Sequence, residues 1–237
     1  MPDRTKLLLL FDIDGTLLQV NGKMNHKILA DALAACGVDG TPIFNERFAG
    51  RTDRDIFLSL PGVVPELFDD IKKEYSYLME NNLSESDIRV IPGVEKCLQY
   101  LKNEGYAMGL ITGNCRDAAY TKLNKAGLGH YFASGGFGDL HEDRNYLPQL
   151  ARTSSSEYFG YAFNPEETFI IGDTPNDIRC ARHASSHAIA VSTGIYSHEE
   201  LAAHNPDLLL SSLEHPENWL TDYINEHQLN SSSGRSD

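Results

Sequence analysis

The sequence of 237 residues predicts an α/β protein built on a doubly wound parallel sheet, with a helical domain inserted after the first strand. Apolar runs of strand length alternate with helix-length segments from residue 91 onward. The first run, residues 7–11, is apolar at every position, which is typical of a strand buried on both faces. Between this run and the alternation, the apolar residues recur at helical spacing.

Residues 19–88 are predicted to form the inserted helical cap. Apolar positions three and four apart indicate helices near residues 24–36 and 66–83. A shorter helix follows residues 50–53, with Thr52 or Asp53 as its N-cap, and Pro61-Gly62 ends it. We therefore assign residues 1–18 and 89–228 to the catalytic core and residues 19–88 to the cap.

The core is predicted as alternating helices and strands. Strands are expected at 106–111, 131–133, 168–172, 187–192 and 207–210, and helices at 93–104, 116–126, 143–158, 175–183, 198–203 and 216–227. The glycine-rich residues 135–138 match neither a dinucleotide fingerprint nor a P-loop and are interpreted as a flexible loop. The polar tail, residues 229–237, is predicted to be disordered.

The composition is strongly acidic, with a formal net charge of −14. Such a surface repels nucleic acids and anionic membranes, so neither is expected as a partner. It also repels a phosphorylated substrate, so a site for one would need a local cation.

No segment near the start has the layout of a signal peptide, and residues 7–11 are too few to span a bilayer. Four cysteines (Cys36, Cys97, Cys115 and Cys180) lack the paired spacing of a disulfide framework or a zinc site. We expect a soluble, cytoplasmic protein with reduced thiols.

Polar side chains follow three of the predicted strands. Asp12 and Asp14 come after the first strand, Thr112 after the second and Asp173 after the strand at 168–172. Ligands of doubly wound sheets bind beyond the carboxyl ends of the strands, so these side chains are expected to meet in one site. An ordinary Asp-Gly turn would explain Asp14 but not Asp12.

Three motifs in this order resemble those of the haloacid dehalogenase-like hydrolase superfamily. They are residues 12–16 (DIDGT), 111–114 (ITGN) and 172–177 (GDTPND). The helical insert resembles the cap of the phosphoglycolate-phosphatase-like members. The resemblance covers essentially the whole chain and implies a Rossmann-like sheet with an α-helical cap over the active site.

The resemblance also implies roles for the acidic residues. Asp12 would be the nucleophile that forms an aspartyl-phosphate, and Asp14 the general acid and then the base. Mg²⁺ would be held by Asp12, the backbone carbonyl of Asp14, and Asp173. True dehalogenases lack an acidic residue at the position of Asp14, so a phosphatase is favoured.

Thr112, Gly113 and Asn114 would bind the substrate phosphate by the same resemblance. The third family motif usually supplies a lysine, but no lysine follows Lys125 in this sequence. Arg144, which would open the helix at 143–158, is the best candidate for that role. Arg152, two turns into the same helix, is the alternative.

Two further residues have competing explanations. Asp177 could cap the helix at 175–183, or it could be a hydrogen-bond partner of metal-bound water, as in the family. Arg51 resembles a residue of the cap loop that selects the substrate, but it could equally be an exposed arginine at a helix start.

The sequence therefore predicts a Mg²⁺-dependent phosphatase of the phosphoglycolate-phosphatase-like kind, which hydrolyses a small-molecule phosphate monoester through an aspartyl-phosphate. One alternative is a phosphosugar mutase on the same fold. Another is a non-enzymatic, Mg²⁺-binding regulator that accepts a phosphoryl group on Asp12. The physiological substrate and the oligomeric state are left open.

Overall fold

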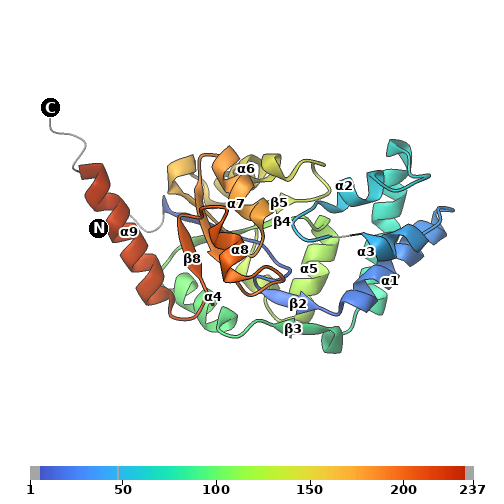
Figure 1. Ribbon diagram of the computed structural model, residues 1–237, viewed down its shortest axis with the longest axis horizontal. Coiled ribbons are helices and arrows are strands. Elements are labelled where there is room, and N and C mark those ends of the chain that lie inside the picture. Colours follow the sequence, from blue (N-terminus) through green and yellow to red (C-terminus); the bar gives the residue numbers. More distant parts are fainter. Residues whose placement is uncertain (1–5, 47, 233–237) are drawn as a thin grey trace.

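The computed structural model describes residues 6–46 and 48–232, and it confirms the predicted fold class. Its main sheet has six parallel strands in the order β5-β4-β1-β6-β7-β8 (Figure 1). The strands are β1 (Leu8–Phe11), β4 (Ala107–Thr112), β5 (Gly135–Phe137), β6 (Thr168–Gly172), β7 (His187–Val191) and β8 (Leu208–Leu210). The first strand of the chain thus lies between β4 and β6, where a wholly apolar strand is expected.

Helices cover both faces of this sheet. Leu9 and Phe11 point into a core shared with α4 (Val94–Asn103), α5 (Arg116–Lys125) and α9 (Pro216–Ser232). Leu8 and Leu10 point the other way, toward α6 (Leu147–Phe159), α7 (Pro175–His183) and α8 (His198–Ala202). Burial on both faces is the reason why β1 carries no polar residue.

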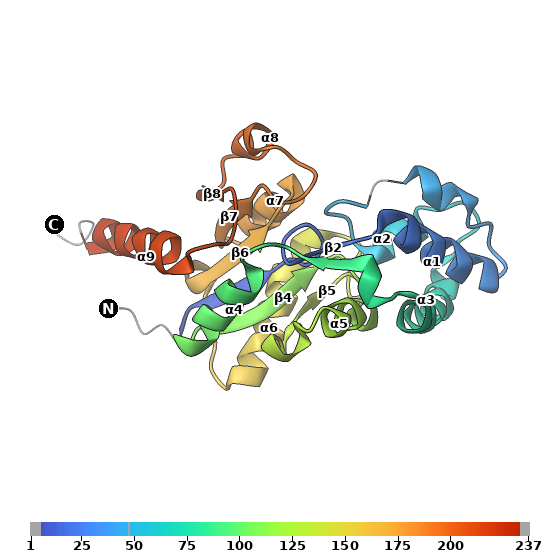
Figure 2. The same cartoon turned by 90° about the horizontal axis from the view of Figure 1, so that it is seen from below.

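The insert forms a helical cap with a separate hydrophobic cluster, which also takes in Cys115 and Ala118 of the core domain. It contains α1 (Gly22–Ala35), α2 (Asp53–Leu58) and α3 (Phe68–Asn82), with short 3₁₀ helices η2 (Thr41–Asn45), η3 (Pro65–Leu67) and η4 (Glu85–Asp87). Two antiparallel strands, β2 (Leu18–Val20) and β3 (Ile88–Val90), connect the cap to the core. Figure 2 shows α1 and α3 at one end of the molecule and α9 at the other.

The segment after α5 differs from the prediction. Residues 129–131 form a 3₁₀ helix (η5, Gly129–Tyr131), and the edge strand is the glycine-rich segment Gly135–Phe137, which the sequence suggested was a loop. A Cβ at Gly135 would lie 2.8 Å from Leu110 Cβ, and one at Gly136 would lie 2.4 Å from the carbonyl oxygen of Leu147. Glycine is therefore needed for close packing of this strand between β4 and α6.

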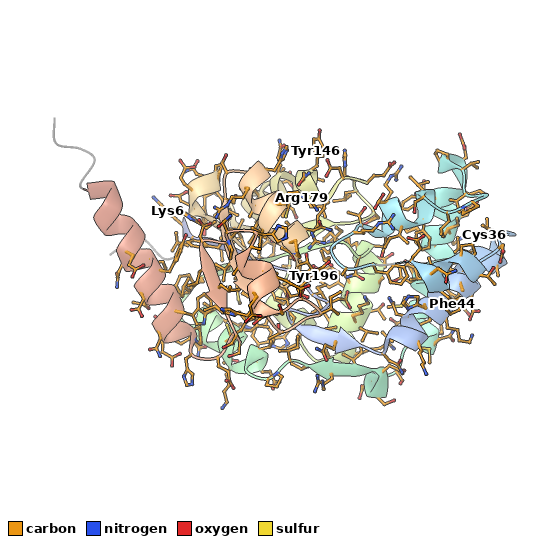
Figure 3. All side chains as sticks on the ribbon, in the orientation of Figure 1. Lys6, Cys36, Phe44, Tyr146, Arg179 and Tyr196 are labelled. Atoms are coloured by element: carbon orange, nitrogen blue, oxygen red, sulfur yellow. The ribbon has the colours of Figure 1, made fainter. Side chains whose placement is uncertain are left out.

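The C-terminal helix is also longer than predicted, since α9 runs to Ser232 and includes part of the tail expected to be disordered. Residues 233–237 lie outside the described residues. Within the part of the chain that the structure describes, no helix combines the length and the apolar character needed to cross a bilayer. Two exposed aromatic side chains are labelled in Figure 3, Phe44 on the cap and Tyr146 on the core.

Candidate active site

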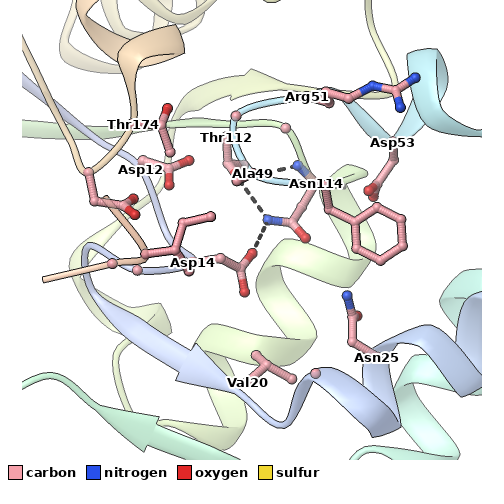
Figure 4. Close-up of a pocket in the computed structure, with 18 of the residues that line it drawn as sticks. Asp12, Asp14, Val20, Asn25, Ala49, Arg51, Asp53, Thr112, Asn114 and Thr174 are labelled. Carbon is pink, nitrogen blue, oxygen red and sulfur yellow. Dashed lines mark hydrogen bonds between the residues drawn. The ribbon is translucent and has the colours of Figure 1, made fainter. Parts of the chain in front are cut away.

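A pocket of about 500 Å³ opens at the carboxyl edge of the main sheet, between the core and the cap (Figure 4). The ends of β1, β4 and β6 place Asp12, Thr112 and Asp173 on its core side. The predicted strand-end residues therefore line one cavity.

Asp12 and Arg144 form an ion pair beneath this pocket. Arg144 Nη2 lies 2.9 Å from Asp12 Oδ1 and 2.5 Å from Asp177 Oδ1, and all three side chains are buried. Arg144 opens the short 3₁₀ helix η6 (Arg144–Tyr146), where the Asp143 side chain accepts a hydrogen bond from the backbone N–H of Asn145. Loss of hydration on burial, partly opposed by Arg144, raises the pKa of Asp12 to about 7.

Three carboxylates converge next to this pair. One oxygen each from Asp12, Asp173 and Asp177 lies within 4.8 Å of the other two. Burial and then the charge of Asp12 raise the pKa of Asp173 well above its ordinary value. The three carboxylates, set against the single positive charge of Arg144, leave two negative charges, which a divalent cation would balance.

The donor set of this cluster fits a hard cation such as Mg²⁺. Every candidate side-chain ligand is a carboxylate oxygen. The backbone leaves little space around Asp173, since a Cβ at Gly194 would lie 1.6 Å, and one at Gly15 2.3 Å, from Asp173 Oδ2. Thr16 Oγ1 donates to Asp173 Oδ1 at 3.1 Å, so one oxygen of this carboxylate is held in place.

Asp177 caps the start of α7, which is one of the two roles expected for it. Its Oδ2 accepts hydrogen bonds from Thr174 N at 3.0 Å and Thr174 Oγ1 at 2.6 Å, which is a capping box at the start of α7. Its Oδ1 accepts from Arg144. Both oxygens are thus engaged with protein donors, unlike those of a residue whose main role is to bind metal.

Asp14 points away from the acidic cluster, into a second network. Lys122 Nζ lies 3.0 and 2.8 Å from the two carboxylate oxygens of Asp14, and Asn114 Nδ2 donates to Asp14 Oδ2 at 2.7 Å. Asn114 Nδ2 also donates to Thr112 Oγ1 at 2.7 Å (Figure 4). The side chain of Asn114, a predicted phosphate ligand, is therefore bound to its neighbours in the protein. Since the Asp14 carboxylate is also engaged, only the backbone of Asp14 remains a candidate for a metal ligand from that residue.

The cap is seated on the loops that follow β4 and β5. Asp53 N donates to the carbonyl oxygen of Gly113 at 2.7 Å, and Thr52 Oγ1 donates to that of Glu142 at 2.8 Å. Asp53 Oδ2 accepts from the backbone N–H of Cys115 at 2.7 Å and so caps α5 from the opposite domain. Burial, opposed by the charge of Lys122, raises the pKa of Asp53 to about 6.

The guanidinium of Arg51 is held within the cap. Its Nε and Nη1 donate to Asp55 and Glu46 at 2.6 and 2.7 Å, and its Nη2 donates to Ser59 Oγ at 3.0 Å. In Figure 4 the side chain extends away from Asp14, although residue 51 belongs to the pocket lining. The other alternative cation, Arg152, donates to Ser186 and is not among the residues that line the pocket.

The cap contributes an aromatic and amide wall to the pocket. The centroids of the His26 and Phe48 rings lie 4.4 Å apart. Asn25, which precedes His26 in the first turns of α1, also lines the pocket. Asn25 Oδ1 is buried with no hydrogen-bond partner among the described residues. This wall lines the cap side of the pocket.

Lys122, His26 and Asn25 were not singled out in the sequence. Asp53 was considered only as an N-cap of α2, a role that the structure gives to Thr52. A signal existed for Lys122, because it follows Ala118 and Ala119 by four and three residues, and both alanines lie on the buried face of α5. A lysine on the buried face of a helix needs acidic or carbonyl partners. The partners themselves come from segments distant in the chain, so their identity could not be predicted from helical spacing.

Residues 9–191 match the model of the haloacid dehalogenase-like hydrolase family. A phosphoglycolate phosphatase of Nitrosococcus oceani is 27% identical over 177 residues, which covers 74% of this chain and 72% of that protein.

Two solved structures resemble the fold. A predicted phosphatase from Clostridium acetobutylicum matches with a TM-score of 0.66 at 19% identity, and the match covers 95% of this chain and 99% of that protein's chain. A β-phosphoglucomutase from Clostridium difficile matches with a TM-score of 0.68 at 17% identity, and the match covers 94% of this chain and 99% of that protein's chain. At these identities the two structures support the fold alone.

Proposed function

This chain belongs to the haloacid dehalogenase-like hydrolase family, and from that premise we propose that it is a Mg²⁺-dependent phosphatase acting on a small-molecule phosphate monoester. The observation that supports this most is the buried pair of Asp12 and Arg144 at the base of the pocket. It joins a nucleophile to a fixed positive charge, which phosphoryl transfer to a carboxylate requires.

Asp12 attacks phosphorus to form an aspartyl-phosphate. Arg144 Nη2 holds Asp12 Oδ1 at 2.9 Å, which fixes the orientation of the carboxylate. The guanidinium also lies near Gly113, since its Nη1 would be 3.2 Å from a Cβ placed there. It can therefore stabilise the charge of the phosphoryl group next to the backbone N–H of Gly113.

Asp14 transfers the protons. In its protonated form it donates one to the departing alkoxide as the P–O bond to the leaving group breaks. The carboxylate thus formed removes one from the water that hydrolyses the aspartyl-phosphate, which restores the protonated form. Its side chain is 40% exposed, and it lies in the pocket lining next to Thr112 and Asn114.

Thr112 binds the phosphoryl group through its hydroxyl. Its Oγ1 accepts hydrogen bonds from both the N–H and the Nδ2 of Asn114, at 3.2 and 2.7 Å. With both acceptor positions of the hydroxyl filled, its hydrogen can be donated to a phosphoryl oxygen.

Asp12, Asp173 and the backbone carbonyl of Asp14 would hold Mg²⁺, with Asp177 behind them. The ion, when bound, neutralises negative charge on the phosphoryl group and on the clustered carboxylates. This local charge balance allows a phosphate ester to enter a protein with a net charge of −14.

Hydrolysis of a panel of phosphate esters, with Mg²⁺ or with a chelator, tests this proposal. The panel contains phosphoglycolate, sugar phosphates and nucleotides, and released phosphate is measured. We expect Mg²⁺-dependent release from at least one small ester, and a loss of at least about 10³-fold in Asp12→Asn. Asp117→Asn, which removes an exposed carboxylate from α5, is the control.

Release of phosphate by Asp12→Asn at the rate of the unmodified protein would refute the nucleophile assignment. Conversion of a hexose phosphate into its isomer, without free phosphate, would favour the mutase. Stable labelling of Asp12 by acetyl phosphate, with no turnover of any ester, would favour the regulator.

A further inference from the structure

Lys122 is the most deeply buried charged side chain beside the pocket, with 1% of its surface exposed. Burial of an ammonium group is costly unless its donors are satisfied. Here the three N–H donors meet three acceptors, namely the two carboxylate oxygens of Asp14 and Asn114 Oδ1, at 3.0, 2.8 and 2.6 Å. The position of the ammonium is therefore fully determined by these two residues.

The ammonium fixes the orientation of the Asn114 amide. Because Lys122 has only donors, it selects Oδ1 of Asn114 as its partner, and Nδ2 then faces Asp14 and Thr112. With the amide reversed, its NH₂ group would face the ammonium, and its oxygen would face the Asp14 carboxylate. One lysine thus determines which atoms donate along the whole path from Asp14 to Thr112.

We propose that Lys122 is a positioning residue of the active site, which holds the Asp14 carboxyl at the leaving-group side of the pocket and orients the Thr112 hydroxyl toward the phosphoryl group through Asn114. This inference rests on the proposed phosphatase function. It adds a residue of α5 to a reaction otherwise carried by strand-end loops and by Arg144.

A role confined to the cap–core interface would have different contacts. Asp53 crosses that interface and its carboxylate is close enough to feel the charge of Lys122, yet it accepts its hydrogen bond from Cys115 N. The hydrogen bonds of Lys122 go to Asp14 and Asn114, which both line the pocket. On the same helix, Lys125 Nζ donates instead to the backbone oxygen of Glu80, away from the pocket lining.

The test compares two substrates of nearly equal shape, phenyl phosphate and 4-nitrophenyl phosphate. Phenolate is the poorer leaving group and needs a proton from Asp14 as the P–O bond breaks, whereas 4-nitrophenolate leaves without one. The quantity measured is kcat/KM, which reports the steps up to formation of the aspartyl-phosphate. The ratio of the two kcat/KM values does not depend on the fraction of active protein.

In Lys122→Met we expect kcat/KM for phenyl phosphate to fall by roughly 30-fold, and for 4-nitrophenyl phosphate by less than about 5-fold. Lys122→Gln, which keeps an amide donor in the same place, is measured in parallel and provides the result if the methionine variant does not fold. Lys125→Met is the matched control and should leave both values unchanged.

An unchanged ratio in the Lys122 variants, with or without an equal loss for both esters, would overturn the positioning of the Asp14 carboxyl by Lys122 while the proposed function remains. A folded, unmodified protein that releases phosphate from neither these esters nor the panel would overturn the proposed function itself, and this inference with it.

Discussion

At Arg144 a guanidinium lies beside the Asp12 carboxylate, where the sequence led us to expect this arginine to act in place of a lysine. The side chain is buried, and Nη2 alone contacts both Asp12 and Asp177. Its Nε is buried with no hydrogen-bond partner among the described residues. A buried donor without a partner is unfavourable. The guanidinium as a whole lines the pocket, where its charge can meet an anion.

Arg144→Ala should lower kcat/KM for phosphate esters by about 10²-fold, because the transition-state charge loses a fixed donor. Without Mg²⁺ it should also lower the free energy of unfolding by about 3 kcal/mol, since buried carboxylates lose their counter-charge. Steady-state kinetics and urea denaturation measure the two effects.

Arg144→Lys separates charge from geometry, since it keeps the charge without the planar fork, and it should recover only part of the activity. Arg179→Ala removes an exposed arginine from α7 and serves as the control. An activity of Arg144→Ala equal to that of the unmodified protein would show that Arg144 has no part in the reaction.

Among the elements, α2 and α5 are joined across the two domains by Asp53. This carboxylate is buried and its pKa is raised to about 6, with loss of hydration as the main cause. An acid whose pKa is higher in the folded state than in the unfolded chain binds more protons when folded. Its contribution to stability is therefore greatest at low pH and declines as the pH rises from about 4 to about 6.

Asp53→Asn should remove this decline, because the amide oxygen can still accept from Cys115 N but carries no charge. As the pH rises from 4 to 7, the unfolding free energy of the variant should increase relative to that of the unmodified protein by up to about 3 kcal/mol. Urea denaturation at several pH values measures it. Asp70→Asn, on the exposed face of α3, is the control, and an equal pH dependence in all three proteins would contradict the prediction.

The loop after β7 closes over the acidic cluster through Gly194. Since a Cβ there would lie 1.6 Å from Asp173 Oδ2, Gly194→Ala must displace either the loop or the carboxylate. We expect the Mg²⁺ concentration for half-maximal activity to rise by about 10-fold or more, with the fold retained. A Mg²⁺ titration of activity, with Ser192→Ala from the same loop as the control, checks this. An unchanged titration would show that the loop moves and the Asp173 carboxylate stays in place.

Over the whole molecule, the site combines a net acidic protein with a cluster that, when its three carboxylates are ionised, carries two negative charges beyond the one that Arg144 balances. The core supplies the strand ends, and the cap covers them through hydrogen bonds from residues 52–54. The cap thus limits what can bind at the strand ends to what a pocket of about 500 Å³ can hold.

Mg²⁺ at about one hundred times its dissociation constant should stabilise the protein by about 2.7 kcal/mol, or roughly 5–10 °C in Tm. The shift should be larger at pH 8 than at pH 5, because protons compete with the metal for Asp12, whose pKa is raised to about 7. Thermal denaturation with MgCl₂, and with EDTA at equal ionic strength, measures it. Asp173→Ala should abolish the shift, and a persistent shift in that variant would place the metal elsewhere.

The sequence was sufficient where local pattern and position agree. The apolar run before Asp12 can only be a central strand, and the motifs around Asp12, Thr112 and Asp173 predicted the family and the fold class, both of which are confirmed. The strand order then brings these residues to one edge, as the rule for doubly wound sheets requires. The prediction was poorest at residues 131–138, where a glycine-rich strand was interpreted as a flexible loop. In a sequence, a glycine needed for close packing cannot be told from one that gives flexibility.

Sequence alone thus determined the kind of sheet, the inserted cap and the acidic strand ends, because each depends on a run of neighbouring residues. Only the tertiary structure decided that Lys122 contacts Asp14, that Asp53 caps a helix of the other domain, and that the guanidinium of Arg51 is bound within the cap. These contacts join side chains from separate segments, and the energy of a buried charge depends on its partners in space rather than on its neighbours in the chain.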